Sequence, residues 1–326
     1  MNRRQFSRAA CGMSLAAMSA AAVAQSSPYP TKPIRIIVSS VAGALLDAST
    51  RLYADRMSRY LKQPVVVENM PGASSMLGAR YVARSAADGY TLLAFANTVL
   101  TMPGLVKGAG YDFNKDFVAL GEMARAPALL VVGGASQYKT LDALVKAAKQ
   151  QPGTLTFGSG GQGTTSHLPV ELFARSAGIS LTHVPYKGVA AIAPDLIAGR
   201  VSCMMGTATS LYGSIQAGSM RALAISSDIR SAKFPNVPTF KELGYPEATY
   251  SIFVGMAAPA GIPKAVQARL AEAIEAARSD PALQTRLAAL DQEVSDVRTP
   301  QQFQAFLQAE EKRTMQLIKG AKIRPE

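Results

Sequence analysis

The sequence has no tryptophan, only two cysteines and two histidines in 326 residues, and 7% aromatic residues. Two cysteines cannot make a fold that disulfide bridges hold together. Metal sites need clusters of ligands, and no His, Cys, Asp or Glu spacing of that kind occurs. No apolar run reaches the roughly 18–20 residues of a membrane-spanning helix, which excludes a polytopic membrane protein. Acidic residues are fewer than basic ones, with 22 Asp and Glu against 34 Lys and Arg. The resulting net charge of +12 favours anionic partners.

What is present describes an ordinary globular protein. Hydrophobic residues make up 48% of the chain and charged residues 17%, which excludes a disordered polymer. The length suffices for two domains, since single cores stop growing at about 250–300 residues. The basic residues are scattered, so the charge does not indicate a nucleic-acid-binding surface.

The first 24 residues are predicted to be a cleaved export signal. Arg3-Arg4 and Arg8 precede the apolar stretch Cys11–Ala24, and small residues stand before the expected cleavage site at Gln25. Arg3-Arg4-Gln5-Phe6 resembles a twin-arginine signal, with an ordinary Sec signal as the alternative. After cleavage Cys203 is the one cysteine left, so no intramolecular disulfide can form.

Apolar, β-branched runs alternate with helical patterns along the rest of the chain, which predicts an α/β fold with a parallel sheet covered on both faces. The pattern changes after a long strand at Ser251–Ala258, because everything beyond Pro263 is helical. These last helices have no strands of their own, so we expect them to pack on the first half of the chain. The chain would then cross between two domains near Ala124–Val131 and Tyr250–Val254. The predicted domains are 25–125 with 253–326, and 126–252.

A glycine-rich segment, residues 157–167, follows one predicted strand and opens a helix. Gly158-x-Gly160-x-x-Gly163 matches the dinucleotide fingerprint, but Tyr186-Lys187 stands where an acidic residue should end the next strand. A P-loop is excluded because Thr164 takes the place of the lysine. A glycine-rich turn with bare N–H groups before a helix predicts an anion site. A flexible connection is the alternative.

Two further polar loops follow predicted strands. Ser39–Asp47 combines hydroxyls, Gly43 and an N-cap candidate in Asp47, and Ala96-Asn97-Thr98 makes a third loop. Ligands of open α/β sheets bind beyond the carboxyl ends of strands, so the three loops should converge on a cleft. A catalytic set is missing, because Ser159 is not in a nucleophile elbow.

Several motifs, taken in order, resemble the Bug-type solute receptors of tripartite tricarboxylate transporters. They include Val67-Glu68-Asn69-x-Pro71-Gly72-Ala73, Asp88-Gly89-Tyr90-Thr91-Leu92-Leu93, Ser166-His167-Leu168 and His183-Val184-Pro185-Tyr186-Lys187-Gly188. The resemblance implies a two-lobed type II periplasmic-binding-protein fold, two α/β domains joined by two crossing strands. It also implies a periplasmic monomer that closes like a flytrap on a small carboxylate and delivers it to membrane subunits. No catalysis and no cofactor are implied. An exported oxidoreductase is the rival hypothesis.

The ligand loops depart from the family in part. Ala42-Gly43-Ala44 replaces a usual Pro-Gly-Gly, and Gly206-Thr207 stands where an Asp often receives amino-acid ligands. The expected ligand is therefore a mono- or dicarboxylate without an ammonium group, with an apolar or aromatic body suggested by Leu46 and Met76. An ordinary small dicarboxylate is the alternative. The candidate ligand-binding residues are Ser39, Ser40, Ala42, Gly43, Ala44, Asn97, Thr98, Ser159, Gly160, Gly163, Thr164, Thr165, Ser166, His167, Tyr186, Gly206 and Thr207.

Overall fold

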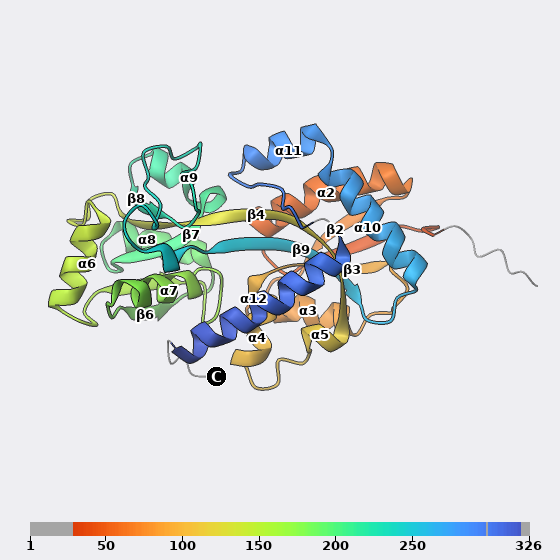
Figure 1. Ribbon diagram of the computed structural model, residues 1–326, viewed down its shortest axis with the longest axis horizontal. Coiled ribbons are helices and arrows are strands. Elements are labelled where there is room, and N and C mark those ends of the chain that lie inside the picture. Colours follow the sequence, from red (N-terminus) through yellow and green to blue (C-terminus); the bar gives the residue numbers. More distant parts are fainter. Residues whose placement is uncertain (1–28, 298, 321–326) are drawn as a thin grey trace, which may run out of the picture. The chain divides into compact units, whose positions relative to one another are not determined.

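The computed structural model describes residues 29–297 and 299–320 (Figure 1). The predicted signal sequence, residues 1–24 with its arginine pair, lies outside the described residues. The fold described below is the compact unit that begins at Lys32. In the described chain, no helix is long and apolar enough to cross a bilayer.

Strands and helices alternate through most of this unit, as their apolar patterns predict. The first part contains β1 (Ile34–Val38), α2 (Leu45–Leu61), β2 (Val65–Asn69), α3 (Met76–Ala83), β3 (Thr91–Ala96), α4 (Asn97–Leu105) and α5 (Phe113–Asp116). The middle part contains β4 (Phe117–Gly133), α6 (Leu141–Gln150), β5 (Thr156–Ser159), α7 (Leu168–Ala177), β6 (Thr182–Pro185), η1 (Val189–Ile192), α8 (Ala193–Ile197), β7 (Cys203–Thr207), α9 (Ala208–Gln216), β8 (Met220–Ile225) and η2 (Pro246–Ala248). The last part contains β9 (Ser251–Pro259), α10 (Lys264–Arg278), α11 (Pro281–Ala288) and α12 (Pro300–Gly320).

The strands of the described chain are ordered β2-β1-β3-β9-β4-β7-β5-β6, and β8 also pairs with β4. β2, β1 and β3 are parallel, and so are β6, β5 and β7. β9 is antiparallel to β3 and β4, and β4 is antiparallel to β7 and β8. The predicted parallel strands are therefore present in two sets, and the two long strands that cross between them, β4 and β9, are antiparallel to their neighbours. β4 leaves one set of parallel strands and β9 returns to it, so these two strands must run in opposite directions.

The two long strands divide the fold into two lobes, as the predicted two-lobed class requires. Phe117–Pro127 of β4 pairs with β9, and the rest of β4, from Ala128, pairs with β7 and β8. Figure 1 shows β4 and β9 side by side between the two groups of elements. We call the group with β1, β2 and β3 the first lobe and the group with β5, β6 and β7 the second. The domain limits at 125/126 and 252/253 stay a prediction.

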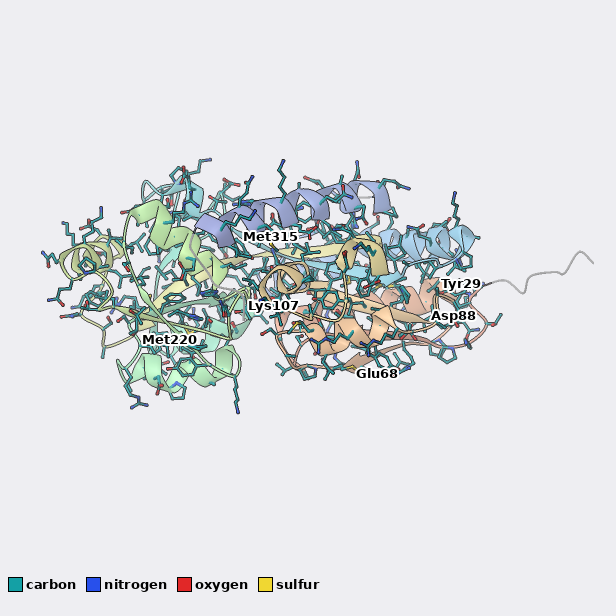
Figure 2. The ribbon with its side chains drawn as sticks, turned by 90° about the horizontal axis from the view of Figure 1, so that it is seen from below. Tyr29, Glu68, Asp88, Lys107, Met220 and Met315 are labelled. Atoms are coloured by element: carbon teal, nitrogen blue, oxygen red, sulfur yellow. The ribbon has the colours of Figure 1, made fainter. Side chains whose placement is uncertain are left out.

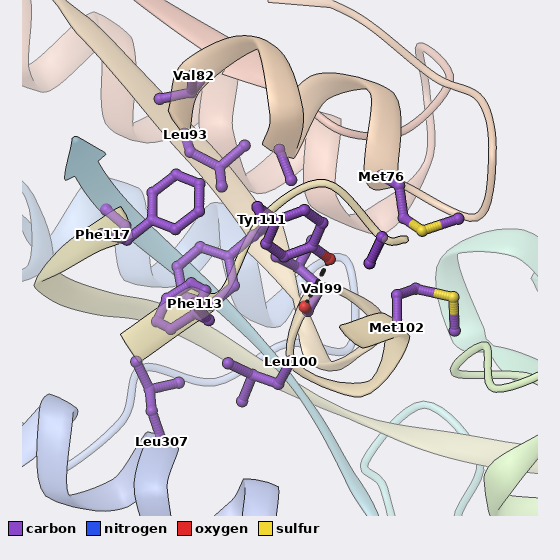
Figure 3. Packing of buried hydrophobic residues seen from close by; sticks show 14 of the residues in the cluster. Met76, Val82, Leu93, Val99, Leu100, Met102, Tyr111, Phe113, Phe117 and Leu307 are labelled. Carbon is purple, nitrogen blue, oxygen red and sulfur yellow. Dashed lines mark hydrogen bonds between the residues drawn. The ribbon is translucent and has the colours of Figure 1, made fainter. Parts of the chain in front are cut away.

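The core of the first lobe is aromatic. Phe95 contacts Phe113, with ring centroids 4.8 Å apart, and Phe253 and Phe303 at 5.9 and 6.1 Å. Figure 3 shows Phe113 in the same cluster together with the hydroxyl of Tyr111, which donates to the Val99 carbonyl at 2.7 Å. Because Phe303 belongs to α12, the last helix packs on the first lobe as expected.

The predicted capping box opens that helix. Gln302 N–H donates to Thr299 Oγ1, and Thr299 N–H donates to Gln302 Oε1, both at 3.1 Å. The N–H groups of the residue before the helix and of its first turn are thus satisfied by side chains.

Candidate functional site

The loop after β1 holds the first group of candidate residues. Ser39 is buried, and its hydroxyl donates to the Ala94 carbonyl on β3 at 3.3 Å. The Ser40 hydroxyl donates to the carbonyl of its neighbour Val41 at 3.4 Å. Ala42 and Gly43 are exposed, and Ala44 takes the N-cap position of α2. This loop is therefore an exposed turn that begins at a buried serine, Ser39.

Asp47 is not the N-cap that the sequence suggested. It lies in the first turn of α2, where its carboxylate accepts from Gly43 N–H at 2.8 Å and Asn69 Nδ2 at 2.9 Å. Arg51 Nε donates to it at 3.0 Å. Burial alone raises the pKa of Asp47, but these donors stabilise the charged form and hold the pKa below its usual value. The Asp47 carboxylate stays ionised and holds the loop in place through its bond from Gly43 N–H.

Asn97 and Thr98 do not form the loop that the sequence predicted, because they are the first residues of α4. The Asn97 amide donates to the Ser251 carbonyl at 3.2 Å and accepts from Phe253 N–H at 3.1 Å. Both ends of this buried side chain thus join α4 to β9. The geometry indicates a structural role for Asn97.

The glycine-rich loop between β5 and α7 satisfies most of its own N–H groups. Gly160 N–H donates to Ser166 Oγ at 2.9 Å, Gly161 N–H to Ser159 Oγ at 3.1 Å, and Gly163 N–H to His167 Nδ1 at 3.0 Å. The expectation that this turn bares its N–H groups is therefore wrong at these three positions. A dinucleotide pyrophosphate would need such donors free.

The free donors lie at the entry to α7 instead. The backbone N–H groups of Thr165 and Ser166, and the Thr165 hydroxyl, have no partner among the described residues. Thr164 Oγ1 donates to the Gly161 carbonyl at 2.7 Å and lies 3.1 Å from Ser166 Oγ. Since a helix N-terminus carries partial positive charge, these adjacent donors suit a carboxylate oxygen.

His183, which opens one of the quoted motifs but was not among the candidate ligand-binding residues, supports this loop. His183 Nε2 lies 2.6 Å from Ser159 Oγ, and its ring stacks on His167 with centroids 4.0 Å apart. Burial, and to a smaller extent His167, lowers the pKa of His183 to about 4. Phe157 pairs with His183 in the β5–β6 register, and this pairing, which brings His183 to the loop, is visible only in the folded structure.

Two other candidate residues already have hydrogen-bond partners, and a third is buried. The Tyr186 hydroxyl donates to Asp195 Oδ2 at 2.7 Å, and Thr207 Oγ1 lies 3.2 Å from Ser210 Oγ. Gly206 is buried in β7, and a Cβ there would lie only 3.0 Å from the Leu211 side chain. An acidic side chain that could bind an ammonium group is absent at that position, and any side chain there would require Leu211 to shift.

The glycine-rich loop also contacts the first lobe. A Cβ on Gly161 would lie 3.5 Å from Ser74 Oγ, and one on Gly163 would lie 2.2 Å from Leu105 and 2.6 Å from Met102. Among the described residues, no hydrogen bond joins this loop to residues 39–44. The two lobes therefore meet here by close packing of two glycines against Ser74, Met102 and Leu105.

The model of one family, the tripartite tricarboxylate transporter family receptor, matches residues 49–323. This chain belongs to that family. It is 38% identical over 299 residues to a UPF0065 protein of Cupriavidus necator, covering 90% of each chain. It is 33% identical over 320 residues to protein BugT of Bordetella pertussis, covering 97% of this chain and 98% of the relative. The predicted Bug-type resemblance is confirmed.

Solved structures agree with this assignment. Periplasmic binding protein BugD is similar with a TM-score of 0.82 and 30% identity, over 91% of this chain and 100% of that one. Rpa4515 of R. palustris, solved with adipate, gives 0.84 and 31% over the same shares. MatC from Rhodopseudomonas palustris, solved with malate, gives 0.80 and 27%, over 89% and 100%. The chain is thus a solute-binding receptor and not an enzyme.

Proposed function

We propose that this receptor is exported to the periplasm, binds a small carboxylate between its lobes as a monomer, and delivers it to the membrane subunits of a tripartite tricarboxylate-type transporter. The observation that carries the proposal is the pair of free N–H groups at Thr165 and Ser166, with the Thr165 hydroxyl beside them. They stand at the lobe boundary, on a helix N-terminus that favours anions. The relatives solved with adipate and malate support the same ligand class.

The structure bears on the ligand's body as well. Leu46 and Met76, which the sequence suggested as an apolar lining, are 5% and 6% exposed, and Met76 belongs to the core cluster of the first lobe. Their burial favours the small aliphatic dicarboxylate over the aromatic acid. The missing acid at Gly206 argues against amino acids, because an unpaired buried ammonium costs several kcal/mol.

Calorimetry of the purified receptor against a matched series tests this proposal. Succinate, malate and adipate should bind, glutamate and citrate should bind at least tenfold more weakly, and benzoate and terephthalate should compete poorly. NAD and FAD serve as the rival series, because the Gly158-x-Gly160-x-x-Gly163 spacing motivated an exported oxidoreductase. A response to a dinucleotide alone would refute the receptor function.

A further inference from the structure

One face of the first lobe carries large apolar side chains that no other part of the described chain covers. Val66 is 44% exposed, Leu77 48% and Tyr81 39%. Leu77 and Tyr81 lie four residues apart on α3 and share a face of the helix. Val66 lies on the edge strand β2 in register with Arg35, which donates to the Tyr81 hydroxyl at 3.0 Å. These three apolar side chains form a patch that we call the α3 face.

The α3 face is hollowed and basic. A groove of about 910 Å³ runs along it, and Arg80 and Arg84 line it without any Asp or Glu. The Arg80 guanidinium bonds only to the Gly108 and Ala109 carbonyls and the Met76 sulfur, and Arg84 has no ion pair among the described residues. These two cations therefore have no carboxylate partner within the described chain.

Glu68, on strand β2 of the same lobe, is paired with Arg35 and not with these cations. Glu68, at the lower edge of the lobe in Figure 2, accepts from Arg35 Nε and Nη2, both at 2.7 Å. This bidentate pair lowers the pKa of Glu68 and keeps it charged against Arg35. The field of the groove is set by Arg80 and Arg84.

We propose that the α3 face docks an acidic segment with an apolar anchor on the membrane subunits of the transporter. Tyr and Arg are the residues that most often dominate protein interfaces, and an apolar centre with a charged rim is their usual anatomy. The unpaired cations call for carboxylates on the partner. The proposal rests on the delivery role proposed above.

Helix α3 also touches the ligand loop from its other side. A Cβ on Gly78 would lie 3.3 Å from the Ser39 Cα and 3.2 Å from the Met70 carbonyl oxygen. The helix is therefore packed tightly against the residue that follows β1. A partner that shifts α3 must move Ser39, which gives the docked transporter a route to loosen the bound solute.

The test measures binding of the purified receptor to the transporter's membrane subunits in lipid nanodiscs, by interferometry at low and high salt. Leu77→Ser with Tyr81→Ser, and separately Arg84→Glu, should each raise the Kd at least tenfold. Tyr212→Ser is the matched apolar control at 42% exposure on α9, and Arg221→Glu is the matched charge reversal on β8. Both controls should stay within twofold of wild type.

Each other outcome overturns the proposal. Wild-type affinity in both α3-face variants would place docking elsewhere, and equal losses in Arg84→Glu and Arg221→Glu would reduce the effect to net charge. A wild-type dimer in sedimentation that Leu77→Ser dissociates would make a second copy the occupant. Absence of wild-type binding would refute the delivery role as well, whereas calorimetry on the same variants reports separately on solute binding.

Discussion

Thr165 and Ser166 are neighbours in the candidate site, but their hydroxyls have different environments. The Thr165 hydroxyl is without a partner among the described residues, whereas Ser166 Oγ is buried and accepts from Gly160 N–H. A hydroxyl donor to a charged ligand contributes about 1.5–3 kcal/mol. Thr165→Val should therefore weaken carboxylate binding roughly tenfold or more without lowering stability.

Ser166→Ala should instead lower the stability of the fold. It leaves the Gly160 N–H without its acceptor, which costs about 1–3 kcal/mol of folding free energy. Urea unfolding and calorimetry on both variants distinguish the two roles. Exposed Thr285→Val on α11 is the control, since its hydroxyl only donates to the Pro281 carbonyl of the same helix. Equal effects of Thr165→Val and Ser166→Ala on stability would contradict this division.

His183 gives the receptor a pH dependence whose sign follows from its environment. Its pKa falls from 6.5 to about 4 in the folded protein, so the unfolded chain binds a proton between these values and the folded chain does not. Stability should therefore decline as the pH drops from about 6.5 toward 4. His183→Gln keeps a polar group near Ser159 and should flatten that decline. The check is urea unfolding at pH 5, 6 and 7; identical slopes for variant and wild type would refute it.

Residue types in a motif were readable from the sequence, but their partners were not. Ser159, Gly160 and His167 stand in one short segment, and the sequence could not show that each bonds to another residue of that segment, namely Gly161, Ser166 and Gly163. His183 lies 24 residues from Ser159 and contacts it only because β5 and β6 pair. Free hydrogen-bond donors can therefore be told from occupied ones only when the folded conformation of the loop is known.

At the scale of elements, Asn97 ties helix α4 to strand β9. Asn97→Ala removes a donor and an acceptor and leaves Phe253 N–H and the Ser251 carbonyl unpaired, which should cost about 1–3 kcal/mol for each buried group. Thermal unfolding should show the loss, while the Kd for carboxylate in the remaining folded protein stays within about threefold. A large loss of affinity without a loss of stability would restore Asn97 to the ligand site.

The alternation of apolar strands and helices predicted most elements, because inner strands such as β1 and β3 are buried on both faces, whereas the edge strands β2 and β6 are only partly buried. Strand direction was not predictable, since β4 and β9 carry the same apolar pattern as the parallel strands. Helix α4 was missed because it begins directly after β3 and contains Pro103. Local pattern identifies an element, and pairing across the sheet decides its direction.

At the scale of the whole unit, the two lobes meet where the glycine-rich loop touches α4. Leu168, at the start of α7, also packs into the core cluster of the first lobe. Hydrophobic groups therefore close this boundary, and lobe separation must expose them. Such a contact suits a receptor that closes on its solute and reopens at moderate cost.

Gly163→Ala should hold the lobes apart. Gly163 has a φ of +68°, and a Cβ there would lie 2.2 Å from Leu105 and 2.6 Å from Met102 across the boundary. Gly153 has a φ of +79° with nothing within 4 Å of its Cβ position, so Gly153→Ala carries a similar backbone strain without the clash. Small-angle scattering with a saturating dicarboxylate should show a larger radius of gyration for Gly163→Ala alone. Calorimetry should show at least a tenfold weaker affinity, about 1.4 kcal/mol, relative to Gly153→Ala. If both variants show the same radius of gyration and the same affinity, closure does not depend on this contact. The lobes then meet in the liganded state by another surface.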